Sequence, residues 1–360
     1  MEIRPFRGFR PRKEIAKKFV AKPYDVISFL EAKETIKNNP FSFLRVTRVE
    51  AETHEIEMDP TPEDMEKARK NLEKFIEDGI LIQEEKEAFY IYRQRMGDHT
   101  QTGIVALFPV EEYKKGRIKK HELTRKKKEE ERVQHILKTR AHTGQVFLFY
   151  KAFEEFDKKL SEIADSQEPV YRIRDDLDVV HEFFVVKNEN EVNEIKKLFE
   201  RVEELYIADG HHRAAAAARV SDILDEKIGK GPHNYFMATA FPHNQLRIFD
   251  YNRVVKSHLT AEELLEKLQE KFETYRSYTV PARPSREHEI TMYVGNRKWY
   301  ILIPKKVPED VVESLDVNIL QREVLEPIFG ISNPREDERI DFVGGIKGLC
   351  ELERMVDKGE

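Results

Sequence analysis

The stretch Leu205–Val220, which reads LYIADGHHRAAAAARV, constrains the fold more than any other part of the chain. Its first four residues, Leu205–Ala208, form a short apolar run suited to a buried strand. The pair Asp209-Gly210 interrupts that run, and Ala214–Ala218 is a series of strong helix formers. The pattern therefore predicts a strand, a tight turn and a helix, in that order.

Two histidines and an arginine stand where this helix would begin. A helix N-terminus carries unpaired amide donors and a partial positive charge, so His211, His212 and Arg213 would add to a site for phosphate or carboxylate. An ordinary capped helix with a solvated basic first turn is the alternative. First turns usually favour acidic residues, which favours a site over that alternative. Asp209 can cap the helix, bind a metal or act as a base.

A second unusual segment, 114–132, is crowded with lysine and arginine before it turns acidic. Such a run is usually a solvated face of the protein. Within it, however, His121 and Glu122 stand beside Thr124, and a carboxylate next to a histidine in a field of positive charge can act as a base near a phosphorylated ligand. Position 125 is arginine, so the segment does not match the HExxH zinc motif.

Composition narrows the class of protein. The chain has 360 residues, 36% of them charged and 39% hydrophobic, and a formal net charge of −6, which argues against general nucleic-acid binding. The single cysteine, Cys350, excludes an internal disulfide and a cysteine-based zinc site. Neither an apolar signal-peptide core nor a run of roughly 20 apolar residues is present. We therefore expect a cytoplasmic enzyme or regulator with no membrane partner.

Local patterns predict further elements along the chain. These are a helix at 30–37 capped by Ser28, a strand at 41–48, a helix from Thr61 to its end at Gly79, a strand pair at 89–95 and 104–110, a helix at 133–141, strands at 146–150 and 179–186, helices at 153–163 and 192–202, strands at 235–241 and 246–251, a helix at 261–272, a hairpin at 290–303 around Gly295-Asn296, and a mostly helical stretch at 308–329.

Two weaker features stay open. Arg4, Arg7, Arg45 and Arg48 are either structural partners for the many acidic residues, or one of them reaches a ligand. The run GGIKG at 344–348 has the look of a glycine-rich nucleotide loop, but no acidic residue follows about 20 positions later, as a dinucleotide-binding unit requires. The chain has no GxxxxGK[ST] motif, which excludes a P-loop enzyme by pattern.

IADGHHR with its alanine-rich helix resembles the ParB/sulfiredoxin-like superfamily, whose members bind nucleotide phosphates at this strand–loop–helix. Five segments resemble one large branch of it that is catalogued as a domain of unknown function: RPFRGFRP at 4–11, PYDV at 23–26, NPFSFLRVTR at 39–48, KHELT at 120–124 and LDVNILQ at 315–321. The resemblance implies a mixed α/β (α+β) fold. It would have an N-terminal α+β segment at 1–110, a ParB/sulfiredoxin-like core with a mixed sheet at 111–260, and a C-terminal helix–hairpin module at 261–360.

Superfamily activities include CTP hydrolysis in chromosome partitioning, sulfinic-acid repair and phosphorylation of free L-serine. The serine kinases are similar in carrying DGHHR, which residues 209–213 reproduce in full. Sulfinic-acid repair needs a reactive cysteine near the basic residues, whereas Cys350 lies far along the chain. ParB proteins add a helix-turn-helix, and the sequence shows none. The resemblance thus implies a kinase that uses ATP or ADP and Mg²⁺ to convert L-serine, or another small hydroxyl compound, to a phosphate ester.

The residue roles follow from the same resemblance and from general chemistry. Asp209 is the expected metal ligand, and either Glu122 or Asp209 takes the hydroxyl proton, with Glu122 preferred. The catalytic set is completed by His211. Expected nucleotide contacts come from Gly210, His211, His212, Arg213, His121 and Thr124.

Two other functions stay open at this stage. A nucleotide-binding regulator would use the same loop without turnover, and a ParB-like DNA binder would show affinity that falls steeply with salt. Beyond a small-molecule substrate, a second copy of the chain is the other partner to consider, and the sequence does not decide between a monomer and a homodimer.

Overall fold

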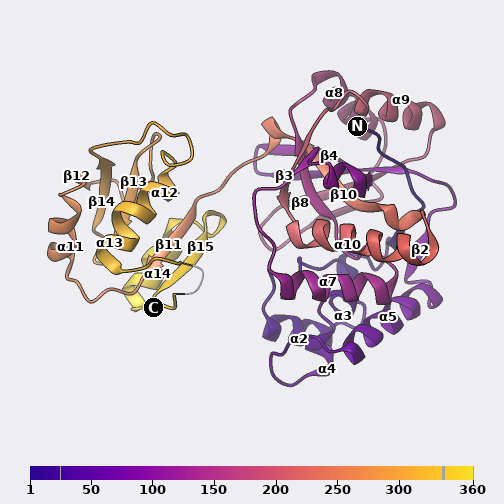
Figure 1. Cartoon of the computed structure of the whole chain (residues 1–360), viewed down its shortest axis with the longest axis horizontal. Helices are drawn as coiled ribbons and strands as arrows, with labels where there is room; N and C mark the ends of the chain where they lie inside the picture. Colours follow the sequence, from indigo (N-terminus) through magenta and orange to yellow (C-terminus); the bar gives the residue numbers. More distant parts are fainter. Residues whose placement is uncertain (25, 335–336, 360) are drawn as a thin grey trace. The chain divides into compact units, whose positions relative to one another are not determined.

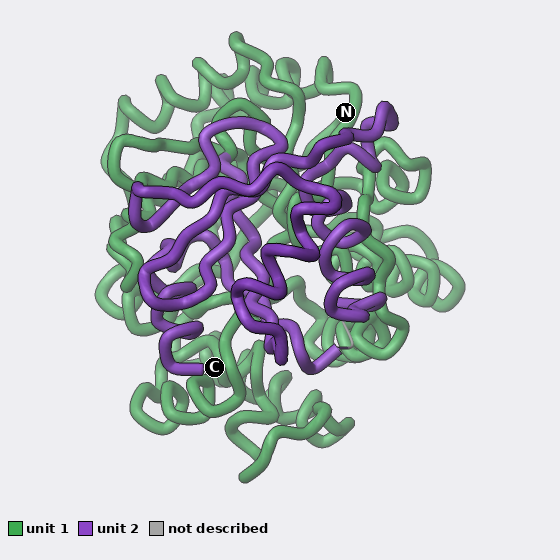
Figure 2. Tube along the Cα trace, turned by 90° about the vertical axis from the view of Figure 1, so that its left-hand side faces the viewer, with its two compact units in different colours: residues 1–246 green, residues 247–360 purple. Residues whose placement is uncertain are grey.

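A large mixed sheet forms the centre of the first of two units into which the chain divides in the computed structural model (Figures 1 and 2). The structure describes residues 1–24, 26–334 and 337–359. The first unit spans residues 1–246 and the second spans residues 247–360. Strands from both sides of residue 110 join the same sheet, so the first unit contains the expected segment 1–110 together with most of the expected core 111–260.

The sheet of the first unit has eight strands. In spatial order they are β5 (Ile118–Lys119), β9 (Leu205–Asp209), β6 (Val146–Tyr150), β10 (Tyr235–Pro242), β4 (His99–Pro109), β3 (Phe89–Met96), β8 (Val180–Val186) and β7 (Tyr171–Arg174). The pairs β5–β9 and β6–β10 are parallel, and all other neighbours are antiparallel. The mixed α/β class and the predicted strands β3, β4, β6, β8, β9 and β10 are thereby confirmed.

The helices of the first unit pack on the sheet and on one another. They are α1 (Ala16–Phe19), α2 (Phe29–Asn38), α3 (Leu44–Thr47), α4 (Glu50–Thr53), α5 (Pro62–Glu77), α6 (Val110–Lys114), α7 (Lys126–Thr139), α8 (Glu154–Asp165), α9 (Glu189–Phe199) and α10 (His211–Ile228). Two short strands, β1 (Phe9–Pro11) and β2 (Leu81–Gln83), pair beside them, and two 3₁₀ turns flank β10 at Pro232–Asn234 and His243–Gln245.

One face of the sheet forms the main core with α8, α9 and α10. Phe108 on β4, Phe199 on α9 and Phe236 on β10 lie within this cluster, and the ring of Phe108 contacts both of the others. Burial of aromatic rings contributes strongly to stability, and edge-to-face geometry adds to it. This packing fixes β9 and the start of α10, which carry the DGHHR residues.

Helix α10 is buried on two sides, which explains its alanines. Ala214 and Ala217 belong to the core under the sheet, whereas Ala216 packs with Val133 of α7 on the opposite side. Only small side chains let a helix approach a sheet and a second helix closely at once. In Figure 1 α7 lies directly beside α10, and helices α2 to α5 continue the stack beyond α7.

Two predicted helix starts are confirmed by their caps. The Ser28 side chain accepts from the Glu31 amide at the start of α2, and the Thr61 side chain accepts from the Asp64 amide at the start of α5. In both, the acidic side chain bonds back to the amide of the capping residue, which completes a capping box.

The second unit contains two small sheets. Its elements are β11 (Tyr251–Val255), α11 (Ala261–Leu268), β12 (Phe272–Ser277), β13 (Ile290–Tyr293), β14 (Trp299–Pro304), α12 (Asp316–Leu320), a π-helical turn (Gln321–Leu325), α13 (Glu326–Phe329), β15 (Ile340–Gly344), a 3₁₀ turn (Gly345–Lys347) and α14 (Leu349–Lys358). Strands β12, β14 and β13 pair antiparallel in that order, and β11 pairs with β15. The predicted hairpin at 290–303 is confirmed as β13–β14.

Two predicted strands are wrong. Residues 41–48 contain the helix α3 instead, because buried Val46 packs against α5 and buried Leu44 packs against α2. The Ser42 hydroxyl also accepts from the Leu44 amide. Residues 246–250 form no strand, because they bury no apolar face: Ile248 is 99% exposed. The strand begins at Tyr251, where β11 finds its partner β15 far along the chain.

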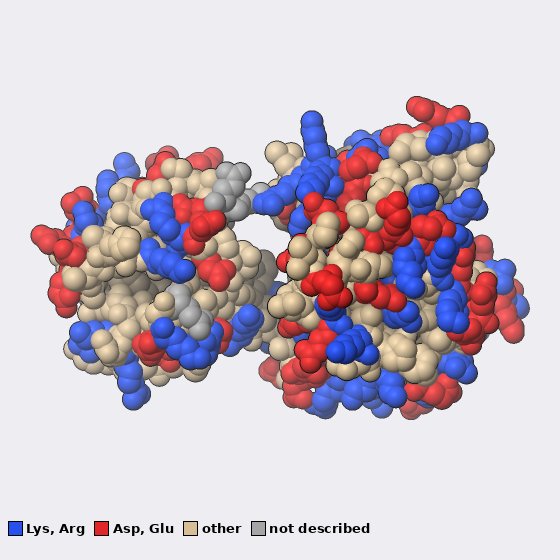
Figure 3. All heavy atoms as spheres, turned by 90° about the horizontal axis from the view of Figure 1, so that it is seen from below, with Lys and Arg blue, Asp and Glu red and all other residues tan. Residues whose placement is uncertain are grey.

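The surface is heavily charged, as the composition predicts. On the face shown in Figure 3, lysine and arginine are interspersed with aspartate and glutamate. Within the described ranges, none of the helices combines the length and the apolar character that a bilayer crossing requires.

Candidate functional site

The DGHHR residues form the junction between β9 and α10. Asp209 is the last residue of the strand, and Gly210 is the N-cap of the helix with φ = +90°, a conformation that favours glycine. Gly210 supplies no side-chain cap, and the first turn of α10 contains no acidic residue. An added Cβ at Gly210 would lie 3.4 Å from the Val146 Cα of the neighbouring strand, so the chain turns tightly against the sheet here.

The KHELT segment lies directly against this junction, although 90 residues separate the two in sequence. The His121 amide donates to His211 Nε2 at 3.4 Å, and the two imidazole rings meet edge to face with centroids 4.5 Å apart. Glu122 Oε2 lies 3.7 Å from His211 Nδ1. The Arg125 amide donates to His212 Nε2 at 3.1 Å. The structure therefore brings the two segments singled out in the sequence into one site.

His211 is the centre of this arrangement. It is only 4% exposed, and because its Nε2 accepts from the His121 amide, its Nδ1 carries the proton of the neutral ring and faces Glu122. Burial lowers the pKa of His211, as does His121 beside it, whereas Glu122 and Asp209 oppose that shift. An anionic ligand at the junction would favour the charged ring in the same way.

Arg213 is held in place by three contacts. Its guanidinium donates to the Gln145 carbonyl, forms an ion pair with Asp209 Oδ2 at 3.2 Å, and lies with its Cζ 5.8 Å from the centre of the Tyr24 ring. The predicted metal ligand Asp209 is thus paired with a cation. Thr124 is engaged elsewhere, because its hydroxyl donates to Glu129 Oε2 at 2.6 Å in the first turn of α7.

Two carboxylates flank His211 and reach solvent. The side chain of Glu122 is 41% exposed and that of Asp209 is 58% exposed. Across the described ranges no group of three or more His, Cys, Asp or Glu side chains is placed to hold a metal ion. A Mg²⁺ ion at this junction would therefore take most of its ligands from phosphate oxygens and water, as Mg²⁺ at nucleotide sites commonly does.

Much of the remaining charge in 114–132 is used in ion pairs. They are Lys114–Asp222, Arg117–Glu112, Lys119–Glu204, Lys127–Asp59, Arg132–Glu131, and Arg219 with Glu129 and Glu130. Apart from Arg132–Glu131, whose arginine is buried, these pairs reach solvent, and such pairs contribute little to stability. They neutralise much of the basic run, so that the cationic groups at the junction itself come mainly from the DGHHR residues.

A pocket of about 530 Å³ lies beside the site, and the sequence did not predict it. Tyr24, Ile27, Arg48, Glu50, Glu57, Met58, Asp59, Pro60, Lys128, Glu131 and Arg132 line it. Tyr24 lies in PYDV and Arg48 lies in NPFSFLRVTR, two of the segments on which the family resemblance rests. That resemblance was the one feature of the sequence that could have pointed to these two pocket residues. Glu50 and Arg132 stand in ordinary helical patterns that mark no function. Of the four N-terminal arginines left open above, Arg48 is the one that lines this pocket.

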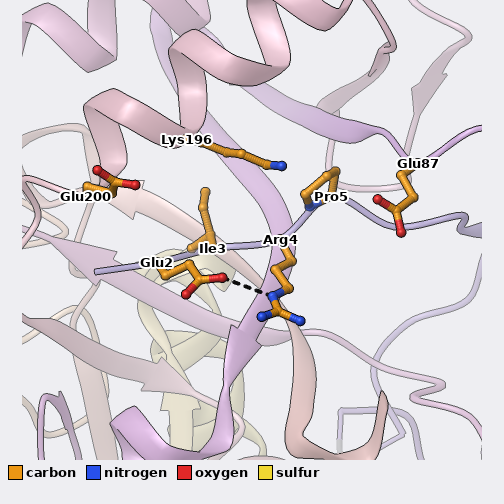
Figure 4. A pocket seen from close by; sticks show the side chains of 7 residues that line it. All are labelled: Glu2, Ile3, Arg4, Pro5, Glu87, Lys196 and Glu200. Carbon is orange, nitrogen blue, oxygen red and sulfur yellow. Dashed lines mark hydrogen bonds and ion pairs between the residues drawn. The ribbon is translucent and has the colours of Figure 1, made fainter. Parts of the chain in front are cut away.

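A second hollow, of about 370 Å³, lies at the N-terminus (Figure 4). Residues 2–5 line it together with Glu87, Lys196 and Glu200. Arg4 is occupied there, with an ion pair to Glu2 at 3.0 Å and a stacking contact over the Tyr235 ring. Arg7 and Arg45 are likewise bonded to protein groups, the Glu84 carbonyl and Glu52 respectively. None of the DGHHR or KHELT residues lines this hollow or the pocket around Tyr24.

The fold and the junction define a mixed α/β protein whose histidine-containing strand–glycine–helix turn is covered by a second polar segment. The chain belongs to the family described as "Protein of unknown function (DUF1015)", whose family model matches residues 3–318. The match covers residues 3–246 of the first unit and reaches into α12 of the second. The predicted membership of a family of unknown function is thus confirmed. No curated protein and no solved structure matches the chain, and the likeness to ParB, sulfiredoxin and serine kinases stays a prediction.

Proposed function

We propose that this chain is a nucleotide-dependent phosphotransferase that phosphorylates a small hydroxyl compound, with free L-serine as the first candidate and O-phospho-L-serine as the product. One observation carries the proposal: His211, at the start of α10, contacts both His121 and Glu122 of a segment 90 residues away. The proposal includes the ParB/sulfiredoxin-like assignment of the core, which rests on the DGHHR resemblance.

Phosphoryl transfer needs charge neutralisation, alignment and a proton acceptor more than covalent chemistry from the protein. The first amides of α10, together with His211, His212 and Arg213, would hold the phosphates of ATP or ADP. His121 would approach the same phosphates from the KHELT side, and Thr124 would do so on releasing Glu129. Mg²⁺, when bound, would neutralise phosphate charge, with Asp209 as its one protein carboxylate.

In the proposed step the acceptor hydroxyl oxygen forms a bond to the terminal phosphorus, and the bond from that phosphorus to the leaving nucleotide breaks. The hydroxyl proton goes to a carboxylate. Glu122 is the better candidate, because it is partly exposed beside His211 whereas Asp209 is paired with Arg213. The neutral His211 ring, with its Nδ1–H toward Glu122, would hold that carboxylate in its charged, proton-accepting form.

The test is an assay with the full-length chain, MgCl₂, L-serine and either ATP or ADP, with phosphoserine measured by mass spectrometry. The expected result is phosphoserine in an amount equal to the nucleotide consumed. Absence of nucleotide turnover with every amino acid and polyol tested would overturn the kinase. If calorimetry then showed tight nucleotide binding without product, the chain would be a nucleotide-binding regulator.

A further inference from the structure

Two buried guanidinium Nε–H groups in the pocket beside the DGHHR junction have no hydrogen-bond acceptor among the described residues, although both side chains form ion pairs through other atoms or at longer range. Arg132 on α7 is only 7% exposed, and its Nε makes no hydrogen bond in the part of the chain that the structure describes. The Nε of Arg48, also buried, makes none there either, although it lies 3.1 Å from Glu50 Oε1. Buried donors without partners are rare in folded proteins, so two in one pocket indicate that something else accepts from them.

The pocket also contains a buried negative charge. Glu50, at the start of α4, is 5% exposed and has Arg48 as its ion-pair partner. Burial raises the pKa of the Glu50 carboxyl, and a cationic group in the pocket would oppose that shift. Cationic and acidic side chains thus line the same cavity within a few ångströms of each other.

The lining of the pocket carries charges of both signs, and this limits the class of ligand that can bind. Three cationic side chains, Arg48, Lys128 and Arg132, face four acidic ones, Glu50, Glu57, Asp59 and Glu131. A nucleotide tail would meet repulsion from the four carboxylates. A small zwitterion can satisfy both signs at once, with its carboxylate on the guanidinium groups and its ammonium on Glu50. The volume of about 530 Å³ is ample for a free amino acid.

One residue connects this pocket to the proposed phosphate site. The Tyr24 ring lies 4.1 Å from Arg132 Cζ in the pocket and 5.8 Å from Arg213 Cζ at the DGHHR junction, both measured from the ring centre. In addition, Lys128, Glu131 and Arg132 stand on α7, which directly follows the KHELT segment. A ligand in the pocket would therefore lie next to the phosphates held at the junction.

We propose that this pocket is the acceptor subsite and binds a free amino acid, with Arg48 and Arg132 on its carboxylate and Glu50 on its ammonium group. As an acceptor subsite the inference rests on the proposed kinase function. As an amino-acid site it stands on the pocket alone, so the two can be tested apart.

The test is calorimetric titration of L-serine into the full-length chain, both alone and with a non-hydrolysable ATP analogue. We compare the wild type with two variants. Glu50→Gln keeps the size of the side chain and removes its charge, and Arg132→Lys keeps the charge and removes the guanidinium group. Glu52→Gln is the matched control, because Glu52 stands on the same short helix α4 but pairs with Arg45 and Asn71 instead of lining the pocket. Circular dichroism checks that each variant folds.

Both pocket variants should weaken L-serine binding by roughly tenfold or more, and the control by less than about twofold. Two analogues test the two ends of the ligand. Ethanolamine lacks the carboxylate and 3-hydroxypropionate lacks the ammonium group, and each should bind roughly tenfold more weakly than L-serine. Absence of L-serine binding under both conditions, or equal binding by all variants, overturns the inference.

Kinase assays separate this inference from the proposed function. Suppose that phosphoserine forms and that the KM for L-serine is the same in the wild type, Glu50→Gln and Arg132→Lys. The acceptor subsite is then wrong and the kinase stands. If L-serine binds, the pocket variants lose that binding, and no nucleotide is turned over with any amino acid or polyol tested, the amino-acid site stands and the kinase is wrong.

Discussion

The structure contains two junctions at which a strand leads through glycine into a helix, and they differ in what lies against them. Gly210 connects β9 to α10, and the run 344–348 connects β15 to α14. Both helices have a glycine N-cap with positive φ and no side-chain cap. At the first junction His211 meets a polar segment from far along the chain. At the second, the Gly345 amide donates to the Asp250 carbonyl at 2.6 Å.

The two junctions differ in the side chains of the first helical turn and in the segments that pack against the glycines. The first turn of α10 carries two histidines and an arginine, whereas the first turn of α14 carries Glu351, which pairs with Arg354. Gly345 begins the 3₁₀ turn before the N-cap Gly348, and an added Cβ there would lie 2.8 Å from the backbone of Asp250, so Gly345 serves close packing. A glycine N-cap is therefore no evidence of a phosphate site by itself. Whether a site forms depends on the side chains of the first turn and on the segment that lies against the start of the helix.

The largest difference between the two junctions should appear when His211 of the first junction is replaced. His211→Ala should lower kcat/KM for L-serine by about 10³-fold, because it removes a phosphate contact and the group that faces Glu122. Cys350→Ala, at the second residue of α14, should change it by less than about twofold. Because His211 is buried, His211→Gln provides a second variant, and thermal unfolding checks both. Equal activity in the histidine variants and the wild type would remove the first junction from the reaction.

The two carboxylates of the first junction can be separated in the same assay. Glu122→Gln should lower kcat by about 10²-fold with little change in KM, because the amide cannot accept the hydroxyl proton. Asp209→Asn should have the smaller effect, about tenfold, through the looser placement of Arg213. A larger loss in Asp209→Asn than in Glu122→Gln would assign the base to Asp209 instead.

Local pattern was enough to predict one half of this site. The apolar run before Asp209, the glycine and the alanines set out the strand, turn and helix, because each of these signals acts within a few residues. The capped helix after Thr61 and the hairpin around Gly295 could be predicted for the same reason. Of these elements, β9 and α10 carry the DGHHR residues, whereas the hairpin belongs to the second unit.

The other half depends on contacts between distant residues, which local pattern does not contain. The approach of His121 to His211 across 90 residues follows from the pairing of β5 with β9, and β5 is only two residues long. The alternating residues of 41–48 indicated a strand, but burial against α5 decided for a helix, so tertiary packing overrode local preference. The Tyr24–Arg132 contact could not be predicted, because its members come from separate helical and loop segments.

Substitution of Gly210 or Gly345 should destabilise the protein at both junctions, but only the first should affect nucleotide binding. Gly210→Ala imposes a side chain on a backbone with φ = +90°, and Gly345→Ala forces a Cβ against the Asp250 backbone. Each should lower the free energy of unfolding by about 1–3 kcal/mol, measured by chemical denaturation. Only Gly210→Ala should also weaken nucleotide binding in calorimetry. An equal loss of binding in Gly345→Ala would show that the two junctions are not functionally distinct.

The smallest expected effect is a pH dependence that belongs to the first junction alone. Burial holds the pKa of His211 below its ordinary value of 6.5. The neutral ring is therefore favoured in the folded state, so its contribution to stability is present above pH 6.5 and is lost as the pH falls through the folded pKa. A bound anion favours the charged ring, so nucleotide affinity should rise a few-fold over the same downward range.

Histidine NMR titrations of the chain with and without ADP measure this directly, with His211→Gln used to assign the resonance. The free protein should show a His211 pKa below 6.5, and saturating ADP should move that pKa upward, because the charged imidazole then has an anionic partner beside the start of α10. A pKa that does not move when ADP binds would place the phosphates away from His211. In that case the contact between His211 and the KHELT segment would be structural, and the first junction would resemble the second in function as well as in geometry.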